Sequence, residues 1–435
     1  MASQNTKPEI SHDQKIVVGL DIGTAKVCAL VAAKDELHPD SIKILGVGTA
    51  VSEGLNRGVV VNIEKTVHSI QKAVEQAEQQ SGKKITEVVV GIAGDHIESF
   101  SKRGVIGISH PNHEISDDDV ERVINESRNF KIASDRNILH IIPQDFIIDG
   151  QDGIVDPVGM SGVRMEANVH IVTGLDTAIQ NIYRCIERLN ISVKNIILEP
   201  LASSYAVLAE EEKEVGVALV DIGGGTTDIA VFDDNVIRFT SVFGIGGRQV
   251  TEDISKGISI TTSQAERIKK ENGHAYAPTI MDDNYFTIPG IAGRKALEVN
   301  KSMLSQIIQP RMEEIFDYAL AEIRRSGYSG RLGAGVVLTG GTSLLMGVEE
   351  LAQERFGMPV KIGFPSSVTY TGLAPEIQTP IYSTAVGLAM FALKDIDDAE
   401  NVPQTEVPEI ETENGSMTSK GDGIFSKIKN ILTQL

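Results

Sequence analysis

The sequence DIGGGTTD occupies residues 221–228, and a shorter copy, DIGT, occupies residues 21–24. Each copy lies between two apolar runs, IVVGL and VCALVAA around the first copy and VALV and IAVF around the second. Apolar runs joined by a short glycine-containing turn predict β-hairpins. The repeat therefore predicts two hairpins, one in each of two lobes, that face each other across a bound nucleotide.

The turn of each hairpin carries the residue types that bind phosphate. Glycines allow positive φ and leave room for backbone N–H groups and threonine hydroxyls to approach the phosphate. An Asp at the end of each first strand can hold the Mg²⁺ of ATP, usually through water, and Asp21 and Asp221 take this position. One such turn alone would indicate an ordinary glycine-rich turn, but two matched copies favour ATP binding. The residues expected to bind ATP and its phosphates are Asp21, Gly23, Thr24, Asp221, Gly223, Gly224, Gly225, Thr226, Thr227 and Asp228.

A third segment, VVLTGGTSLLMGVEEL at residues 336–351, predicts a strand, a Gly-Gly-Thr turn and a helix. Such a turn lets an adenine ring lie against the main chain, and the start of a helix favours anionic groups. Gly340, Gly341 and Thr342 are therefore expected to bind adenosine. The sequence contains neither the GxxxxGK[ST] loop nor a GxGxxG turn between a strand and a helix.

The three motifs, in this order, resemble those of the actin, heat-shock chaperone and sugar-kinase superfamily. The resemblance implies an α/β fold with two actin-like lobes and duplicated phosphate-binding hairpins. Two helices cross between the lobes in that superfamily, and the segments from residue 197 (ILEPLASSYAVLAEE) and from residue 383 (STAVGLAMFAL) resemble them. Small residues in both segments would allow the two helices to approach closely at a hinge.

Within the superfamily the chain resembles the FtsA family of actin-like bacterial division proteins. The resemblance runs from about residue 15 to residue 394 and resumes at the C-terminal sequence GIFSKIKNILTQL; it is most specific in DIGGGTTDIAVF, FGIGGRQVTEDIS and ITTSQAERIKKENG. It implies that Glu199 orients the water that attacks ATP, and that Glu266 and Lys269 contact the adenosine. The sequence also allows simpler interpretations: Glu199 precedes Pro200 and could be a first-turn helix acid, and Glu266 with Lys269 could be a solvated helical pair.

The resemblance also implies how the chain divides into subdomains, including an inserted subdomain of the kind called IC. Within that insert, Ser116 followed by Asp119 predicts a capped helix start. The expected segments are a flexible tail at 1–14, lobe I (IA) at 15–84 and 169–207, the IC insert at 85–168, lobe II (IIA) at 208–245 and 331–371, a IIB subdomain at 246–330, a return helix at 372–394, an acidic disordered linker at 395–422 and an amphipathic helix at 423–435.

Composition excludes several functional classes. The chain has 435 residues and a net charge of −20, which opposes nonspecific binding to nucleic acid. Two cysteines support no disulfide framework and fit a reducing cytosol. The first 14 residues lack the apolar core of a signal peptide, and no apolar run approaches the length of a membrane span. We therefore expect neither secretion nor a membrane-spanning segment.

The C-terminal segment predicts a reversible membrane anchor. Residues 395–422 hold nine acids and one lysine, which is typical of a disordered, self-repelling linker. Beyond it the large apolar residues follow helical spacing on one face, with two lysines beside that face. A short amphipathic helix is usually packed on its own core, but the linker separates this one from the body. The residues expected to bind membrane are Ile424, Phe425, Lys427, Ile428, Lys429, Ile431, Leu432 and Leu435.

Rough magnitudes indicate the strength of this anchor. Six apolar side chains half-buried at roughly 1 kcal/mol each, and about 1 kcal/mol per lysine near anionic lipid, give a gross term of roughly 8 kcal/mol. Ordering such a short helix removes several of these kcal/mol. A single anchor should be weak, whereas a row of subunits would bind strongly through effective concentration.

Together the motifs and the resemblance predict a peripheral protein on the cytoplasmic face of the inner membrane at the division site. The resemblance to the FtsA family implies that it binds ATP and Mg²⁺, polymerises with further copies of itself (a homopolymer of FtsA-like subunits), holds the C-terminal tail of FtsZ and recruits downstream division proteins. Any ATPase activity should be slow and serve as an assembly switch. In the IIB region, Arg294, Lys301 and Arg311 are the candidates for contact with the FtsZ tail.

Three other interpretations remain open. A small-molecule kinase of the same superfamily would need a base for its acceptor hydroxyl, and no sugar-kinase signature identifies one. A heat-shock-type chaperone would need a β-rich peptide-binding domain after the second lobe. A pilus or cell-shape scaffold would lack both the terminal helix and the IC-type insert.

Overall fold

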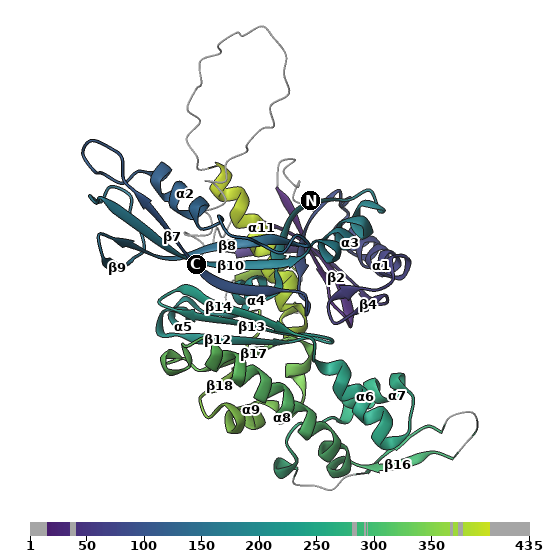
Figure 1. Ribbon diagram of the computed structural model, residues 1–435. Coiled ribbons are helices and arrows are strands. Elements are labelled where there is room, and N and C mark those ends of the chain that lie inside the picture. Colours follow the sequence, from purple (N-terminus) through teal and green to yellow (C-terminus); the bar gives the residue numbers. More distant parts are fainter. Residues whose placement is uncertain are drawn as a thin grey trace, which may run out of the picture.

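The computed structural model describes residues 15–34, 41–280, 285–290, 293, 295–365, 369–372 and 377–400. The expected N-terminal tail, most of the acidic linker and the whole amphipathic helix lie outside these residues, as does Arg294. Two lobes, an inserted subdomain and a helical subdomain make up the described part (Figure 1).

The first lobe is built on a six-stranded sheet in the order β11-β6-β1-β2-β3-β19. Neighbours β1–β2 and β2–β3 are antiparallel, whereas β1–β6, β6–β11 and β3–β19 are parallel. Helix α1 packs on β2 and β3, and helix α11 packs on β1 and β2. The elements of this lobe are β1 Ile16–Ile22, β2 Lys26–Lys34, β3 Ser41–Val51, β4 Leu55–Asn56, β5 Val59–Val60, α1 Ile63–Ser81, β6 Glu87–Ile92, α3 Asp176–Glu187, β11 Ser192–Leu198, α4 Glu199–Val207, β19 Thr369–Gly372, η5 Pro380–Tyr382 and α11 Ser383–Glu400.

The second lobe is built on a five-stranded sheet in the order β14-β13-β12-β17-β18. Every residue of β12 and β13 is buried, which agrees with the apolar runs VALV and IAVF within these strands. Helices α8 and α9 share one apolar core with this sheet. The elements of this lobe are α5 Glu210–Val215, β12 Val217–Ile222, β13 Thr227–Asp233, β14 Val236–Phe243, η3 Ser329–Arg331, β17 Val336–Thr339, η4 Gly341–Leu344, α9 Val348–Phe356 and β18 Val360–Ile362.

A four-stranded antiparallel sheet in the order β7-β10-β8-β9, together with helix α2, forms the unit that we call the insert. The predicted capping box is present: the Asp119 N–H donates to Ser116 Oγ (3.3 Å), and the Ser116 N–H donates to Asp119 Oδ2 (3.1 Å). The insert has its own apolar core. Its elements are β7 Glu98–Gly107, α2 Asp117–Glu126, β8 Arg136–Ile148, β9 Gln151–Ile154 and β10 Arg164–Leu175.

The helical subdomain, which we call the IIB region, follows β14. It contains α6, α7, a two-stranded ribbon of β15 and β16, and the start of the long helix α8. Its elements are α6 Gly247–Ile258, α7 Thr262–Asn272, η1 Ala277–Thr279, β15 Tyr285–Ile288, β16 Leu297–Asn300 and α8 Lys301–Arg325.

The structure draws some boundaries differently from the sequence. Strand β6 pairs in parallel with β1, so residues 87–92 belong to the first lobe and not to the expected insert at 85–168. At its other end the insert includes all of β10, to Leu175. Helix α11 runs to Glu400, into the expected linker, and Lys194 Nζ pairs with Asp395 Oδ2 (3.3 Å) in this added stretch.

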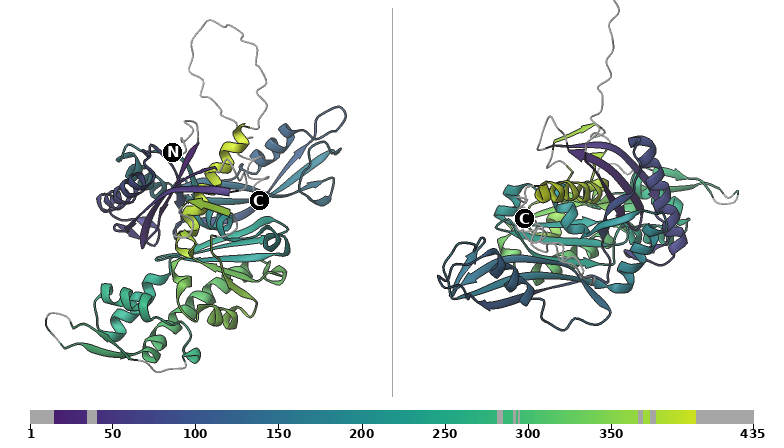
Figure 2. Two further views of the ribbon diagram at one scale, coloured as in Figure 1. Left: turned by 180° about the vertical axis from the view of Figure 1, so that it is seen from behind. Right: turned by 90° about the horizontal axis from the view of Figure 1, so that it is seen from above.

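Three views show how the parts lie together (Figures 1 and 2). Helix α11, in yellow, runs through the middle of the molecule and packs against α4, so the two crossing segments predicted from small residues do meet. The insert lies beside β14, the edge strand of the second-lobe sheet. Within the described residues, no helix combines the length and the apolar character needed to cross a membrane.

Candidate functional site

The two predicted hairpins are present and meet at their tips. In the first, β1 pairs with β2 so that Ile22 lies opposite Val27; in the second, β12 pairs with β13 so that Ile222 lies opposite Thr227. A Cβ atom built on Gly225 would lie 2.6 Å from Thr24 Oγ1. One built on Gly224 would lie 2.6 Å from Ala25 Cβ. Glycine is therefore needed in the second turn because the first turn is already in contact with it.

The floor between the hairpins holds a cluster of four carboxyl groups, those of Asp21, Glu199, Asp221 and Asp228. Asp21, Asp221 and Asp228 are 7%, 6% and 2% exposed. Burial, followed by the negative charges of the three aspartates, raises the pKa of the Glu199 carboxyl well above its ordinary value. Burial and the charge of Asp221 do the same to the pKa of Asp228. The cluster concentrates negative charge at the place where the sequence predicts Mg²⁺.

Asp221 is the best anchored member of the cluster. Ser203 Oγ on α4 donates to Asp221 Oδ2 (2.6 Å), and Ser203 Oγ lies 3.1 Å from Thr384 Oγ1 on α11. Burial raises the pKa of Asp221 to about 6, although the Ser203 hydrogen bond opposes the shift. Both crossing helices therefore position one aspartate of the second hairpin.

The cluster fits a hydrated cation better than one held by side chains alone. Asp228 Oδ1 is buried and has no hydrogen-bond partner among the residues that the structure describes. An oxygen of this kind is costly unless a cation or water satisfies it. In the same part of the chain, no group of three or more His, Cys, Asp or Glu side chains is arranged to hold a metal ion by itself. These observations suit Mg²⁺ whose remaining ligands are water and phosphate oxygens.

Glu199 is the first residue of α4, where the sequence also allowed a simple first-turn acid. A Cβ atom built on Gly91, at the end of β6, would lie 3.0 Å from Glu199 Cγ. The side chain thus lies over the carboxyl end of β6, within the reach of charge from Asp21, Asp228 and Asp221. This places Glu199 in the carboxyl cluster.

The expected adenosine residues lie next to the second hairpin. Thr342 Oγ1 donates to the carbonyl oxygen of Gly223 (3.0 Å). Gly340 has φ 82°, and a Cβ atom built there would lie 2.3 Å from Asp221 Oδ1. The Gly-Gly-Thr turn is therefore packed against the phosphate hairpin. The helix predicted directly after it is instead the short η4, and α9 begins only at Val348 because Gly347, at φ 71°, precedes it.

Glu266 and Lys269 form a largely buried ion pair that holds the start of α6, and not a solvated pair on the helix surface. Lys269 Nζ donates to the Gly247 carbonyl oxygen (2.8 Å) and to Thr251 Oγ1 (2.8 Å), and it pairs with Glu266 Oε2 (2.8 Å). Lys269 is 8% exposed. A Cβ atom on Gly247 would lie 2.3 Å from Thr342 Oγ1, so Gly247 joins this pair to the Gly-Gly-Thr turn. Thr342 and Lys269, two of the residues expected at the adenosine, therefore meet at Gly247 in the first turn of α6.

Sequence reasoning missed several residues of the site. Lys26 lies just after the first turn; its positive charge lowers the pKa of Asp21, against the larger effect of burial. Its Nζ donates to the Ile381 carbonyl oxygen (2.7 Å). Proximity to DIGT could have identified Lys26, but nothing local in the sequence identifies Ser203 or Thr384.

The basic residues expected to bind an acidic partner peptide do not form one cluster with the residues above. Lys301 is the first residue of α8. Arg311, further along α8, donates from Nε to Asp253 Oδ2 (2.7 Å) and also pairs with Glu314. A peptide carboxylate would have to compete with these two acids for Arg311. These contacts reduce the charge that Arg311 can offer to a partner.

Comparison with known families gives two matches along the chain. A family model described as "Cell division protein FtsA" matches residues 218–387, which include the second hairpin and the Gly-Gly-Thr turn. A model described as "SHS2 domain inserted in FTSA" matches residues 94–173, close to the limits of the four-stranded insert.

Curated relatives are similar over nearly the whole chain. The FtsA protein of Pseudomonas aeruginosa is 47% identical over 88% of this chain and 91% of its own length. That of Neisseria meningitidis is 41% identical over 97% of this chain and 98% of its own length. That of Escherichia coli K12 is 40% identical over 87% and 90%, respectively.

Solved structures with low sequence identity share the fold. The PilM-PilN type IV pilus biogenesis complex has a chain with a TM-score of 0.63 and 15% identity, covering 87% of this chain and 98% of that one. MreB5 of Spiroplasma citri bound to ADP has a TM-score of 0.55 and 14% identity, covering 89% and 99%. The two-lobed architecture with a separate insert is thus an actin-like ATPase fold.

Proposed function

This chain belongs to the FtsA family of cell division proteins, and from that premise we propose that it is an ATP-dependent tether that polymerises on the inner membrane and holds FtsZ filaments there. The observation that carries the nucleotide part is the contact between two glycine turns above a buried carboxyl cluster. The observation that carries the membrane part is the amphipathic spacing at the C-terminus.

In this proposal the hairpin turns bind the ATP phosphates through backbone N–H groups and through Thr24, Thr226 and Thr227. Mg²⁺ bound through water at Asp21 and Asp221 would supply the positive charge that the carboxyl cluster lacks. Glu199 orients the attacking water. The turn at residues 340–342, with the pair Glu266 and Lys269 behind it, supports the adenosine.

The nucleotide would act as an assembly switch. The cluster binds Mg·ATP at the junction of the two lobes, so occupancy favours one relative position of the lobes. Slow hydrolysis would then change the relative position of the lobes and, with it, contacts between neighbouring subunits. Membrane binding by a row of weak anchors makes attachment depend on this assembly.

Contact with the FtsZ tail is assigned to the IIB region, at Arg294, Lys301 and Arg311. Downstream division proteins would bind to the insert or to the polymer. A small-molecule kinase is a weaker candidate, because the relatives that cover most of the chain are division proteins.

Vesicle sedimentation with Mg·ATP tests this function. The full chain, mixed with vesicles that contain anionic lipid, should pellet and carry purified FtsZ with it, whereas a chain truncated after Asp422 should stay in the supernatant. Ile428→Glu, on the apolar face of the terminal segment, should also abolish pelleting. Asn430→Glu adds the same charge on the polar face and is the matched control, with most pelleting retained.

Two outcomes would overturn parts of the proposal. Equal pelleting of the truncated chain would show that the terminal segment is not the anchor. Pelleting of the full chain with FtsZ left in the supernatant would show that FtsZ is not the partner held by this protein.

A further inference from the structure

One hydrogen bond links the insert to the helix that carries Glu199. The backbone N–H of Leu198 donates to Nε2 of His140, at 3.0 Å. His140 lies on β8 of the insert, opposite Val172 of β10. Leu198 is the last residue of β11 and the residue directly before α4. The contact therefore joins two parts of the chain that the sequence separates by 58 positions.

The Leu198 N–H needs this partner. Strand β11 is the last strand in its sheet and pairs only with β6 among the described strands, so one of its edges has no strand beside it. Leu198 is fully buried, so water is a poor substitute for a protein acceptor. The residue before α4 contributes no side-chain cap to that helix. The imidazole of His140 thus fixes the place where β11 ends and α4 begins.

The state of the imidazole suits an acceptor. Burial lowers the pKa of His140 to about 4, so the ring is neutral at neutral pH. Nε2 accepts the Leu198 proton, which places the ring proton on Nδ1. A neutral ring also adds no charge beside the carboxyl cluster.

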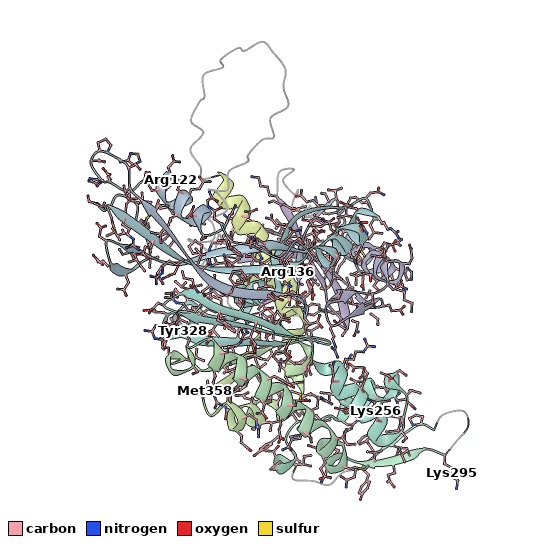
Figure 3. The ribbon with its side chains drawn as sticks, viewed as in Figure 1. Arg122, Arg136, Lys256, Lys295, Tyr328 and Met358 are labelled. Carbon is pink, nitrogen blue, oxygen red and sulfur yellow. The ribbon has the colours of Figure 1, made fainter. Side chains whose placement is uncertain are left out.

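Strand β8 is itself held firmly at its start. Arg136, labelled in Figure 3, donates from one guanidinium nitrogen to the carbonyl oxygens of His96 (2.7 Å) and Thr173 (3.2 Å). Further along the same strand, Gln144 Nε2 donates to the carbonyl oxygen of Ile237 in β14 (2.9 Å). His140 therefore lies between two residues of β8 that are hydrogen-bonded to other elements, which favours a fixed position for its ring.

Helix α4 carries two groups of the nucleotide site within its first five residues. Glu199 is its first residue, and Ser203 donates to Asp221 Oδ2. A shift or fraying of the first turn would move Glu199 most, because Ser203 is one turn further along and is also held by Thr384. The contact from His140 acts on the end of the helix that has the weaker anchors.

We propose that His140 is a positioning residue of the nucleotide site: from the insert, its imidazole holds the start of α4 and so places Glu199 over the bound nucleotide. The inference rests on the proposed function, since it requires ATP in the cleft. It makes the insert a structural part of the nucleotide site as well as a surface for partners.

The test uses the full chain, three single variants in the insert, and His140→Phe combined with Glu199→Gln. His140→Phe removes the acceptor and keeps a planar ring, and His140→Gln offers a side-chain oxygen as a substitute acceptor. His170→Phe is the matched control: His170 lies in the insert as His140 does, on the neighbouring strand β10, but its Nε2 contacts Thr240 Oγ1 of β14 (2.8 Å) and not the start of α4. The measurements are hydrogen exchange of peptides covering residues 196–204 with Mg·ATP, the ATP dissociation constant, and single-turnover hydrolysis.

In His140→Phe we expect amide exchange at residues 196–204 to rise about tenfold and hydrolysis to fall about tenfold, with the ATP dissociation constant within about twofold. His140→Gln should restore wild-type amide exchange and hydrolysis. His170→Phe should leave the exchange at residues 196–204 and the hydrolysis rate unchanged. In a Glu199→Gln background, His140→Phe should have no further effect on hydrolysis, because the two residues act through one group.

Unchanged exchange in His140→Phe would overturn the inference, as would an equal rise in His170→Phe. Failure of the wild-type chain to bind ATP would overturn both the inference and the proposed function. ATP binding with normal exchange in every variant would overturn the inference alone. The wild-type dissociation constant therefore separates the two failures.

Discussion

The two phosphate hairpins share a sequence motif but differ in the residue of the second strand that pairs with the first aspartate. In the first hairpin Asp21 lies opposite Cys28, and in the second Asp221 lies opposite Asp228. Cys28 is fully buried, and so is nearly all of Asp228. The first hairpin thus carries one buried acid and the second carries two.

This difference assigns the two hairpins different roles. Burial raises the pKa of Asp21 and that of Asp221, and the charge of Lys26, which follows the first turn, opposes both shifts. Asp228 instead faces Asp221, and its Oδ1 lacks a hydrogen-bond partner in the described part of the chain. The second hairpin therefore has the greater need for a cation, whereas the first contributes one buried acid, Asp21, and the turn that contacts Gly225.

The largest expected effect comes from making the first hairpin resemble the second. Cys28→Asp would place a second buried carboxylate opposite Asp21, with no hydrogen-bond donor provided for it. An unpaired buried charge should lower the free energy of unfolding by roughly 3–5 kcal/mol. Urea denaturation at neutral pH measures the loss. Cys28→Ser controls for the lost sulfur, and a loss in Cys28→Asp no larger than in Cys28→Ser would show that the site tolerates the charge.

The second prediction removes an acid from the second hairpin. Asp221 has a folded-state pKa of about 6 and an unfolded value near 3.8, so the folded protein retains a proton that the unfolded chain loses within this pH window. The contribution of Asp221 to the free energy of unfolding of the nucleotide-free protein should therefore fall as pH rises from about 4 to 6, by on the order of 3 kcal/mol, and stay low above that. Asp221→Asn removes this loss and keeps an acceptor for Ser203.

The measurement is the difference in unfolding free energy between Asp221→Asn and wild type, without nucleotide, from pH 4 to pH 8. The stability of Asp221→Asn relative to wild type should increase as pH rises to about 6 and then stay constant. Burial lowers the pKa values of His140 and His170 to about 4, so these histidines reduce stability as pH falls from about 6.5 to 4, which is the opposite sign. Their contribution is the same in the variant and in wild type, so it cancels in the difference. With Mg·ATP the order should reverse. A difference that does not change with pH would contradict the assignment of the shift to Asp221.

The smallest expected effect compares glycines of the two turns. Gly225→Ala brings a methyl group to 2.6 Å from Thr24 Oγ1 and so separates the hairpin tips, whereas Gly23→Ala meets the Lys26 carbonyl oxygen at 3.0 Å within its own turn. We expect ATP affinity to fall about tenfold for Gly225→Ala and about threefold for Gly23→Ala. Titration with a fluorescent ATP analogue gives both values. Equal losses would mean that contact between the tips does not matter for binding.

The sequence predicted those parts of the site that local patterns encode. The two hairpins follow from glycine turns between apolar runs, and the capped start of α2 follows from Ser116 and Asp119. The close approach of α4 and α11 follows from small residues in both segments. Each of these features depends on main-chain conformation or on apolar spacing within a few residues.

The sequence could not predict features that depend on contacts between distant side chains. Ser203 and Thr384 are 181 positions apart, and only the fold brings them together at Asp221. Lys269 has the spacing of a surface pair with Glu266, yet its ammonium group is buried because α6 offers it two oxygen atoms. Strand β6 belongs to the first-lobe sheet because it pairs in parallel with β1. The apolar run of β6 predicts a strand but does not indicate which strand lies beside it.

The close crossing of α4 and α11 limits how the two lobes can move relative to each other. A Cβ atom built on Gly387 would lie only 1.7 Å from the Ala202 carbonyl oxygen, so the helices touch with no room for a side chain between them. Such tight contact permits rotation about the contact more readily than sliding. A rotation about this crossing would move the outermost strands of the insert and of the IIB region furthest, because they lie farthest from it (Figure 1). Probes on those strands would therefore report a change in lobe position better than probes near the two hairpins.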